Sequence, residues 1–234
     1  MSTETAITKD KLDEYLKELA KEYRKLNAKN MHAEIILIGG AAVLANYGFR
    51  DMTYDIDAVI AAASTMKEAA NQVGDKLGLP NGWLNMDFKK TKSYSDKLAQ
   101  VSVYYKTYSN ILTIRTVTAE YLIAMKLMSG REYKFDLSDI AGILLEHEKS
   151  GDPISRATID NAVKELYGER KKIPVNSVKY IDDIFTSKDY LKIYQEIRSS
   201  EKEAKEMLLD FNKSYPNALN EDNLADILNK ARQK

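Results

Sequence analysis

The chain has 234 residues, and its 35 basic and 35 acidic side chains cancel to a formal net charge of zero, so it lacks the global positive field that steers many nucleic-acid-binding proteins. It contains no cysteine, which excludes a disulfide framework, a cysteine-ligated zinc site and a thiol nucleophile. No window approaches the ~18 apolar residues of a membrane-spanning helix, and the charged, amphipathic N-terminus does not resemble a signal peptide, so we expect a cytoplasmic protein without a membrane partner.

Hydrophobic periodicity and turn residues predict the secondary structure. In the first part of the chain they predict a helix over 10–28, a strand over 33–38, a short helix over 41–47, a strand over 53–60 and a helix over 64–78. Next come a short strand over 83–88, a polar loop over 89–97, strands over 99–105 and 110–117 joined by a hairpin turn at 106–110, and helices over 119–130 and 136–149. From Ser155 the pattern is helical to the end, with breaks at Pro174 and near 214–217, and the alternating charges at 199–206 predict a solvated helix face.

Two aspartates interrupt the apolar strand predicted over 53–60. Asp55 and Asp57 are two residues apart, so on a strand they lie on one face, about 7 Å apart at Cα. There they can converge on one cation, and Mg²⁺ commonly takes one or two carboxylates together with substrate phosphates. Taken alone, the pair is better explained by two acids that face solvent from an edge strand, or by one that caps a local element.

A glycine pair lies where the strand over 33–38 meets the following helix. Gly39 and Gly40 allow a phosphate to approach the backbone, and the helix directs free N–H groups at such an anion. A tight turn without a ligand would explain them too, and neither GxxxxGK(S/T) nor GxGxxG is present. Arg50 and Thr53 come just before the aspartates, where the arginine is either a phosphate ligand or an ordinary surface residue.

The segment GGAAVLANYGFRDMTYDID, residues 39–57, resembles the polymerase-β-like nucleotidyltransferase superfamily, in which a Gly-Gly or Gly-Ser turn precedes two metal-binding aspartates. The Arg and Thr before D-x-D are similar to the minimal AbiEii-like and DUF6036-like nucleotidyltransferases. The downstream segment EYLIAMKLMSGREYKFDLSDI matches the order of a helical lysine, an arginine and D-x-x-D in that group. The resemblance covers about residues 36–145.

The resemblance implies an α+β fold, in which a small mixed nucleotidyltransferase-fold sheet with flanking helices is followed by a C-terminal helical region. We expect residues 1–30 to form an N-terminal helix packed on the core, residues 31–150 to form the nucleotidyltransferase-fold domain, and residues 151–234 to form a C-terminal helical domain. Some members of the AbiEii-like group are toxins in toxin–antitoxin or phage-defence pairs, so a cognate antitoxin is an implied partner.

The resemblance also assigns roles to individual residues. Those implied as catalytic are Asp55, Asp57, Lys126, Asp136 and Asp139. Those implied for nucleotide binding are Gly39, Gly40, Arg50, Thr53 and Arg131. Asp55 and Asp57 would hold Mg²⁺ or Mn²⁺. Lys126 could instead extend from an apolar helix to solvent, and Asp136 and Asp139 could simply favour a helix start.

One part of the family pattern is missing. Active members carry a third carboxylate on a neighbouring strand, and the strands predicted over 99–105 and 110–117 have none in their cores. Asp87 is the best remaining metal ligand, with Glu120 second, while His32 and His147 are expected to be structural. We therefore expect a nucleotidyltransferase that uses an NTP and an RNA, protein or small-molecule acceptor, or alternatively a catalytically inactive module of the same fold that binds a nucleotide or a partner.

Overall fold

A computed structural model describes residues 6–27, 31–85, 87–131, 134–169, 172–216, 218–220 and 223–232. The first half contains α1 (Lys9–Leu26), β1 (Ala33–Leu37), α2 (Gly39–Asn46), β2 (Ile56–Ala61), α3 (Thr65–Leu77), β3 (Leu84–Asn85), the 3-10 helix η1 (Asp87–Lys90), α4 (Leu98–Val101), β4 (Ser102–Tyr108) and β5 (Leu112–Val117). The second half contains α5 (Ala119–Ser129), α6 (Asp136–Lys149), α7 (Arg156–Tyr167), α8 (Val175–Ser187), α9 (Tyr190–Ser214) and α10 (Leu224–Arg232). Within these ranges no helix is both long and apolar enough to cross a membrane.

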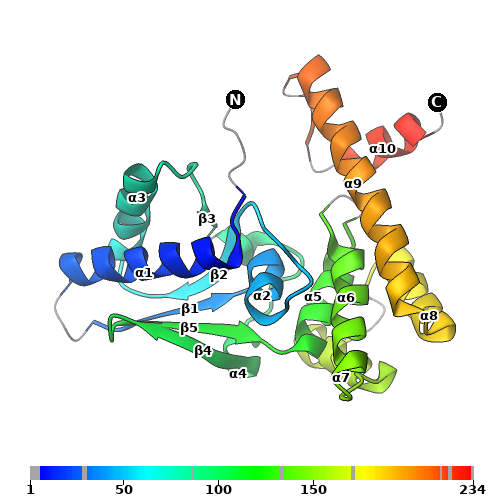
Figure 1. The fold of residues 1–234 in the computed structure, drawn as a ribbon, viewed down its shortest axis with the longest axis horizontal. Coiled ribbons are helices and arrows are strands. Elements are labelled where there is room, and N and C mark those ends of the chain that lie inside the picture. Colours follow the sequence, from blue (N-terminus) through cyan, green and yellow to red (C-terminus); the bar gives the residue numbers. More distant parts are fainter. Residues whose placement is uncertain are drawn as a thin grey trace.

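The strands form one five-stranded mixed sheet in the order β3-β2-β1-β5-β4. β1 runs antiparallel to β2 and parallel to β5, while β2 and β3 are parallel. In Figure 1 the sheet with α1, α2 and α3 makes one half of the molecule, and α5 to α9 make the other. The predicted fold class, a small mixed sheet with flanking helices and a C-terminal helical region, is confirmed.

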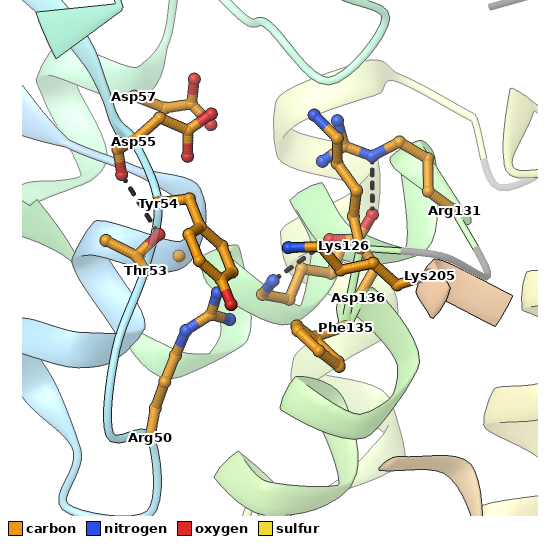
Figure 2. Close-up of a pocket in the computed structure, with 12 residues that line it drawn as sticks. Arg50, Thr53, Tyr54, Asp55, Asp57, Lys126, Arg131, Phe135, Asp136 and Lys205 are labelled. Carbon is orange, nitrogen blue, oxygen red and sulfur yellow. Dashed lines mark hydrogen bonds and ion pairs between the residues drawn. The ribbon is translucent and has the colours of Figure 1, made fainter. Parts of the chain in front are cut away.

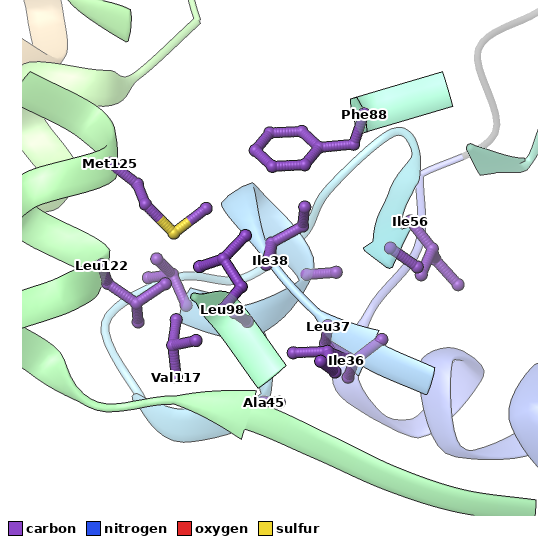
Figure 3. Packing of buried hydrophobic residues seen from close by; sticks show 14 of the residues in the cluster. Ile36, Leu37, Ile38, Ala45, Ile56, Phe88, Leu98, Val117, Leu122 and Met125 are labelled. Carbon is purple, nitrogen blue, oxygen red and sulfur yellow. The ribbon is translucent and has the colours of Figure 1, made fainter. Parts of the chain in front are cut away.

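One continuous hydrophobic core joins the two halves and includes buried residues from Ile7 to Ile184. Figure 3 shows how Leu122 and Met125 of α5 lie near Ile38, at the end of β1. A second small cluster, formed by Ala204, Leu208 and Leu228, packs α10 against α9. The end of β1 and the start of α2 are therefore fixed between the sheet and α5, which is where the site lies.

The strand predicted over 53–60 begins later than expected. The backbone of Thr53 exchanges two hydrogen bonds with Ile7, of 2.7 and 2.9 Å, in an isolated antiparallel bridge. This pairing draws residues 53–55 out of the sheet, so β2 starts at Ile56 and Asp55 precedes it. The prediction that both aspartates belong to one strand is therefore wrong for Asp55.

The hairpin also differs from the prediction. Its turn covers only residues 109–111, where Ser109 and Asn110 have the positive φ values of 52° and 51° that are typical of a type I′ turn, so β4 runs on to Tyr108. At the other end, the segment predicted as strand from residue 99 begins as the short helix α4, because Leu98 packs into the core one turn before Val101. The strand near 83–88 is limited to β3, since η1 starts at Asp87.

Candidate functional site

A cavity of about 230 Å³ lies at the junction of the sheet with the helical half. It is lined by Gly40, Arg50, Thr53, Tyr54, Asp55, Asp57, Lys126, Arg131, Lys134, Phe135, Asp136 and Lys205. Figure 2 shows Asp55 and Asp57 on one side of it and Lys126, Arg131 and Lys205 on the other. Expected site residues as far apart in the sequence as Gly40 and Asp136 are thus brought to one cavity, together with Lys205 from much farther along the chain.

The two aspartates form the acidic wall of the cavity. Asp57 is the second residue of β2 and accepts a 2.7 Å hydrogen bond from the side-chain amide of Asn85, its register partner on β3. Burial and the nearby charge of Asp55 raise the pKa of the Asp57 carboxyl, although the Asn85 hydrogen bond and the charges of Lys134 and Arg131 act in the opposite direction. This wall therefore holds negative charge that a cation would stabilise.

The glycine pair brings the start of α2 against this wall. Gly39 has φ +57°, and a Cβ there would lie 3.0 Å from Oδ2 of Asp57. A Cβ at Gly40 would lie 2.6 Å from the guanidinium of Arg50 and 2.7 Å from the hydroxyl of Thr53. A side chain at either position would lie too close to these groups, so close packing is by itself enough to explain both glycines. Among the described residues no side chain caps the start of α2, and Gly40 in its first turn lines the cavity.

Two contacts hold the side chain of Arg50 in place at the cavity. Its Nε donates to the carbonyl of Met52 at 3.0 Å, and its Nη1 pairs with the carboxylate of Asp139. The side chain is buried, yet it reaches the lining beside Gly40. The interpretation of Arg50 as an ordinary surface arginine is therefore wrong.

Lys126, Arg131 and the two downstream aspartates form a chain of ion pairs. Nζ of Lys126 lies 3.2 Å from Asp136 and 2.7 Å from Asp139, and Nε of Arg131 lies 3.0 Å from the other oxygen of Asp136. Burial alone would raise the pKa of the Asp136 carboxyl, but Lys126 and Arg131 lower it to about 2. Asp136 therefore stays ionised and fixes both cations at the cavity.

Asp139 lies deeper than Asp136. Its side chain is 0% exposed and is absent from the described cavity lining, but it pairs with Arg50 and Lys126 and has Arg198 at 3.9 Å. Lys126 is only 4% exposed, so it does not extend to bulk solvent as a surface lysine would. This geometry suits a positioning role for Asp139 and a direct role at the cavity for Lys126.

The remaining candidates lie elsewhere or outside the described region. The side chain of Asp87 is not among those described, although its backbone opens η1. Glu120 is absent from the cavity lining, and His147 contacts the hydroxyl of Tyr47 at 3.2 Å. Within the described residues no group of three or more His, Cys, Asp or Glu side chains is positioned to hold a metal ion.

Sequence reasoning missed several residues of the site. Asn85 could be found only from the register of β3 with β2. Phe135 lines the cavity with φ +60°, an unusual conformation for a bulky residue and one often found at functional sites. The charged run 199–206 was predicted to be solvated, which is wrong for Glu201, because its carboxylate is 2% exposed and accepts hydrogen bonds from α6. The only sequence signal for this buried face is the helical spacing of Ala204 and Leu208 after Glu201, because all three are buried on α9.

The chain is similar to the crystal structure of an antigenic nucleotidyltransferase-like protein from Paracoccidioides brasiliensis, at 16% sequence identity and a TM-score of 0.38, covering 75% of this chain and 95% of that one. No curated protein matches. A family described as "Nucleotidyltransferase of unknown function (DUF6036)" matches residues 14–183, from α1 to α8. The chain therefore belongs to this nucleotidyltransferase family.

Proposed function

We propose that this chain is a metal-dependent enzyme that transfers a nucleoside monophosphate from an NTP to an acceptor hydroxyl. The observation that carries the proposal is a single cavity with an acidic wall and a cationic wall. Asp55 and Asp57 form the first, while Lys126 and Arg131 belong to the second. A nucleotide complexed with a cation has the complementary distribution of charge, because its cation would face the acidic wall and its phosphates would face the cationic wall.

The charge of the cavity supports a triphosphate as the ligand. Among the described lining residues five side chains are cationic and three are acidic, and Asp139, which pairs with two of these cations, brings the formal net charge of the group to +1. One divalent cation would raise this to about +3, which offsets most of the roughly four negative charges of a triphosphate chain at neutral pH. A neutral or cationic substrate would leave the cationic wall uncompensated.

The donor set suits Mg²⁺ or Mn²⁺. The raised pKa of Asp57 reflects burial beside a second carboxylate, which is the arrangement that a bound cation relieves. Two carboxylates also leave coordination positions for water and phosphate oxygens, as Mg²⁺ requires. When bound here, the ion would neutralise charge on the phosphate oxygens.

The chain's own residues would position the reacting groups. The N–H groups at the start of α2, at Gly39 and Gly40, and the side chains of Lys126 and Arg131 would bind phosphate oxygens. Asp136 would hold both cations in place. The acceptor oxygen would form a bond to the α-phosphorus as the bond to pyrophosphate breaks, and its proton would pass to solvent or a nearby base. Catalysis would come from positioning and charge neutralisation.

We extend this proposal to the acceptor substrate and to the biological role. RNA, a protein and a small molecule are all acceptors of the required chemistry, because each offers a hydroxyl group. The AbiEii-like pattern of residues supports a toxin that is paired with an antitoxin protein. A small reading frame for such a protein beside this gene would support that role.

A specific observation favours a second candidate, an inactive module that binds a nucleotide. Asn85 is the register partner of Asp57 on the neighbouring strand, where active relatives of the resembled superfamily carry a third carboxylate. Its amide donates a hydrogen bond to one oxygen of Asp57, so this position supplies no negative charge. Such a module would bind the metal–nucleotide complex without transfer.

Label transfer separates the two candidates. The protein is incubated with each labelled NTP, Mg²⁺ and a cell extract, and the same reaction is run with Asp55→Asn plus Asp57→Asn. Asp75→Asn, which changes an exposed acid on α3, serves as the matched control. We expect the wild type and the control to transfer label and the double variant to lose transfer. Transfer that survives in the double variant contradicts the site, and metal-dependent NTP binding without transfer supports the inactive module.

A further inference from the structure

Helix α9 contributes a side chain to the cavity from outside the part of the chain that the family covers. The family match ends at residue 183, whereas α9 spans Tyr190–Ser214. We propose that α9 completes the substrate-binding cavity and that Lys205 binds the phosphate chain of the nucleotide. This inference rests on the proposed function and extends it to a segment that the family description does not include.

The position of Lys205 is the first observation. It lines the cavity, and its Nζ lies 3.5 Å from the centre of the Tyr54 ring. Tyr54 and its chain neighbour Asp55 both line this cavity, so the ammonium group lies in the same cavity as the two aspartates. Figure 2 shows Lys205 and Tyr54 extending toward one another from opposite sides of the cavity.

The second observation is that α9 is fixed rigidly next to the site. Oε1 of Glu201 accepts hydrogen bonds from the backbone N–H groups of Leu137 at 2.9 Å and Ser138 at 3.4 Å, in the first turn of α6. The guanidinium of Arg198 lies 3.8 Å from the centre of the Phe135 ring. Lys205 follows Glu201 by four residues, so it lies on the same face of the helix. The ammonium group is therefore held near the cavity by a buried anchor one turn away.

The third observation concerns the strength of the contact that Lys205 makes with Tyr54. A cation–π contact is weaker than a charge-assisted hydrogen bond to a phosphate oxygen. A phosphate oxygen within reach of Nζ would therefore bind the ammonium more strongly than the ring does. Phosphate is also the ligand group that the other cations of the cavity, Arg131 and Lys134, would attract.

Equilibrium binding tests the inference without requiring turnover. Dissociation constants are measured by titration calorimetry for each of the four NTPs with Mg²⁺, and for Mg²⁺ with inorganic tripolyphosphate, which has no base or sugar. The variants are Lys205→Met, which keeps the stem but removes the charge, and Lys205→Arg, which restores the charge. The matched control is Lys202→Met, because Lys202 is exposed on the same helix. Urea unfolding of each variant measures the structural contribution separately.

We expect Lys205→Met to weaken the binding of both ligands about tenfold, the effect of losing one charge-assisted hydrogen bond. Lys205→Arg should stay within about threefold of the wild type, and the control should be unchanged. Equal affinity of the wild type and Lys205→Met overturns this inference alone. A loss seen with NTP but not with tripolyphosphate, or no binding of tripolyphosphate by the wild type, overturns the phosphate assignment. Absence of any Mg²⁺-dependent NTP binding by the wild type overturns the proposed function and this inference together.

Discussion

The buried carboxylate of Glu201 predicts an unusual dependence of stability on pH. Burial raises its pKa from 4.5 to about 7, and the charges of Asp139 and Asp136 act in the same direction, whereas hydrogen bonds from Ser138 and Leu137 lower it. Its second oxygen has no hydrogen-bond partner within the part of the chain that the structure describes. Charging this group in the folded protein is therefore unfavourable, although its other oxygen caps α6.

The direction of this pH dependence follows from the pKa of Glu201 in the unfolded chain and in the folded protein. Between pH 4.5 and about 7 the folded protein retains the proton on Glu201 while the unfolded chain has lost it, so the free energy of unfolding falls as pH rises through this window. The full difference in pKa corresponds to roughly 3 kcal/mol, of which roughly 2 to 3 kcal/mol develops between pH 5 and pH 8. Tyr180, a neighbouring titratable group, does not change charge in this range, because burial raises the pKa of its hydroxyl.

The assay is urea unfolding of the wild type and of Glu201→Gln at pH 5 and pH 8. The new amide would place an unpaired NH₂ group in the interior, but that cost does not depend on pH. We therefore expect the variant to gain roughly 2 to 3 kcal/mol relative to the wild type between pH 5 and pH 8. Glu203→Gln, at an exposed position of the same helix, should show no such gain. Parallel pH profiles for the wild type and Glu201→Gln would refute the reasoning.

Three further predictions concern the cavity itself. Lys126→Met should lower the free energy of unfolding by about 3–5 kcal/mol at pH 7, because it leaves buried carboxylates uncompensated. Lys134→Met, which changes an exposed lysine, should lower it by less than about 0.5 kcal/mol. Equal effects of the two variants in urea unfolding would contradict the ion-pair chain. Gly40→Ala should lower the free energy of unfolding by about 1–3 kcal/mol, because the new methyl group would lie 2.6 Å from the guanidinium of Arg50. In the same assay Gly48→Ala should lower it by less, because no described atom lies within 4 Å of a Cβ at that position. Asp57→Asn should abolish any rise of melting temperature on adding Mg²⁺, and a rise as large as that of the wild type would exclude this carboxylate as a ligand.

Much of the fold was predictable because its elements carry regular hydrophobic patterns. The strand over 33–38 and the helices over 64–78, 119–130 and 136–149 appear close to their predicted bounds. The errors arise where tertiary contacts override local pattern. Thr53 leaves the sheet because its backbone pairs with Ile7, which lies far away in the sequence.

The candidate site was only partly accessible from the sequence. Asp57 and Gly40 could be identified because their motif is contiguous, and the resemblance linked them to Lys126. The partner of Asp57 could not be identified, because it depends on the register between β2 and β3. The contribution of α9 was hidden because alternating charges do not reveal which helix face is buried; Glu201 is buried while Lys202 and Glu203 beside it are exposed.

The most direct test of the account is whether a nucleoside triphosphate binds in this cavity only with a divalent cation. Titration calorimetry of the wild-type protein with each NTP would be run in Mg²⁺ and in EDTA, and repeated with Asp55→Asn plus Asp57→Asn. The account predicts binding of at least one NTP in Mg²⁺, and loss of that binding both in EDTA and in the double variant. Binding of equal affinity in EDTA, or in the double variant with Mg²⁺, would contradict the central claim that the two aspartates form a cation-dependent nucleotide site.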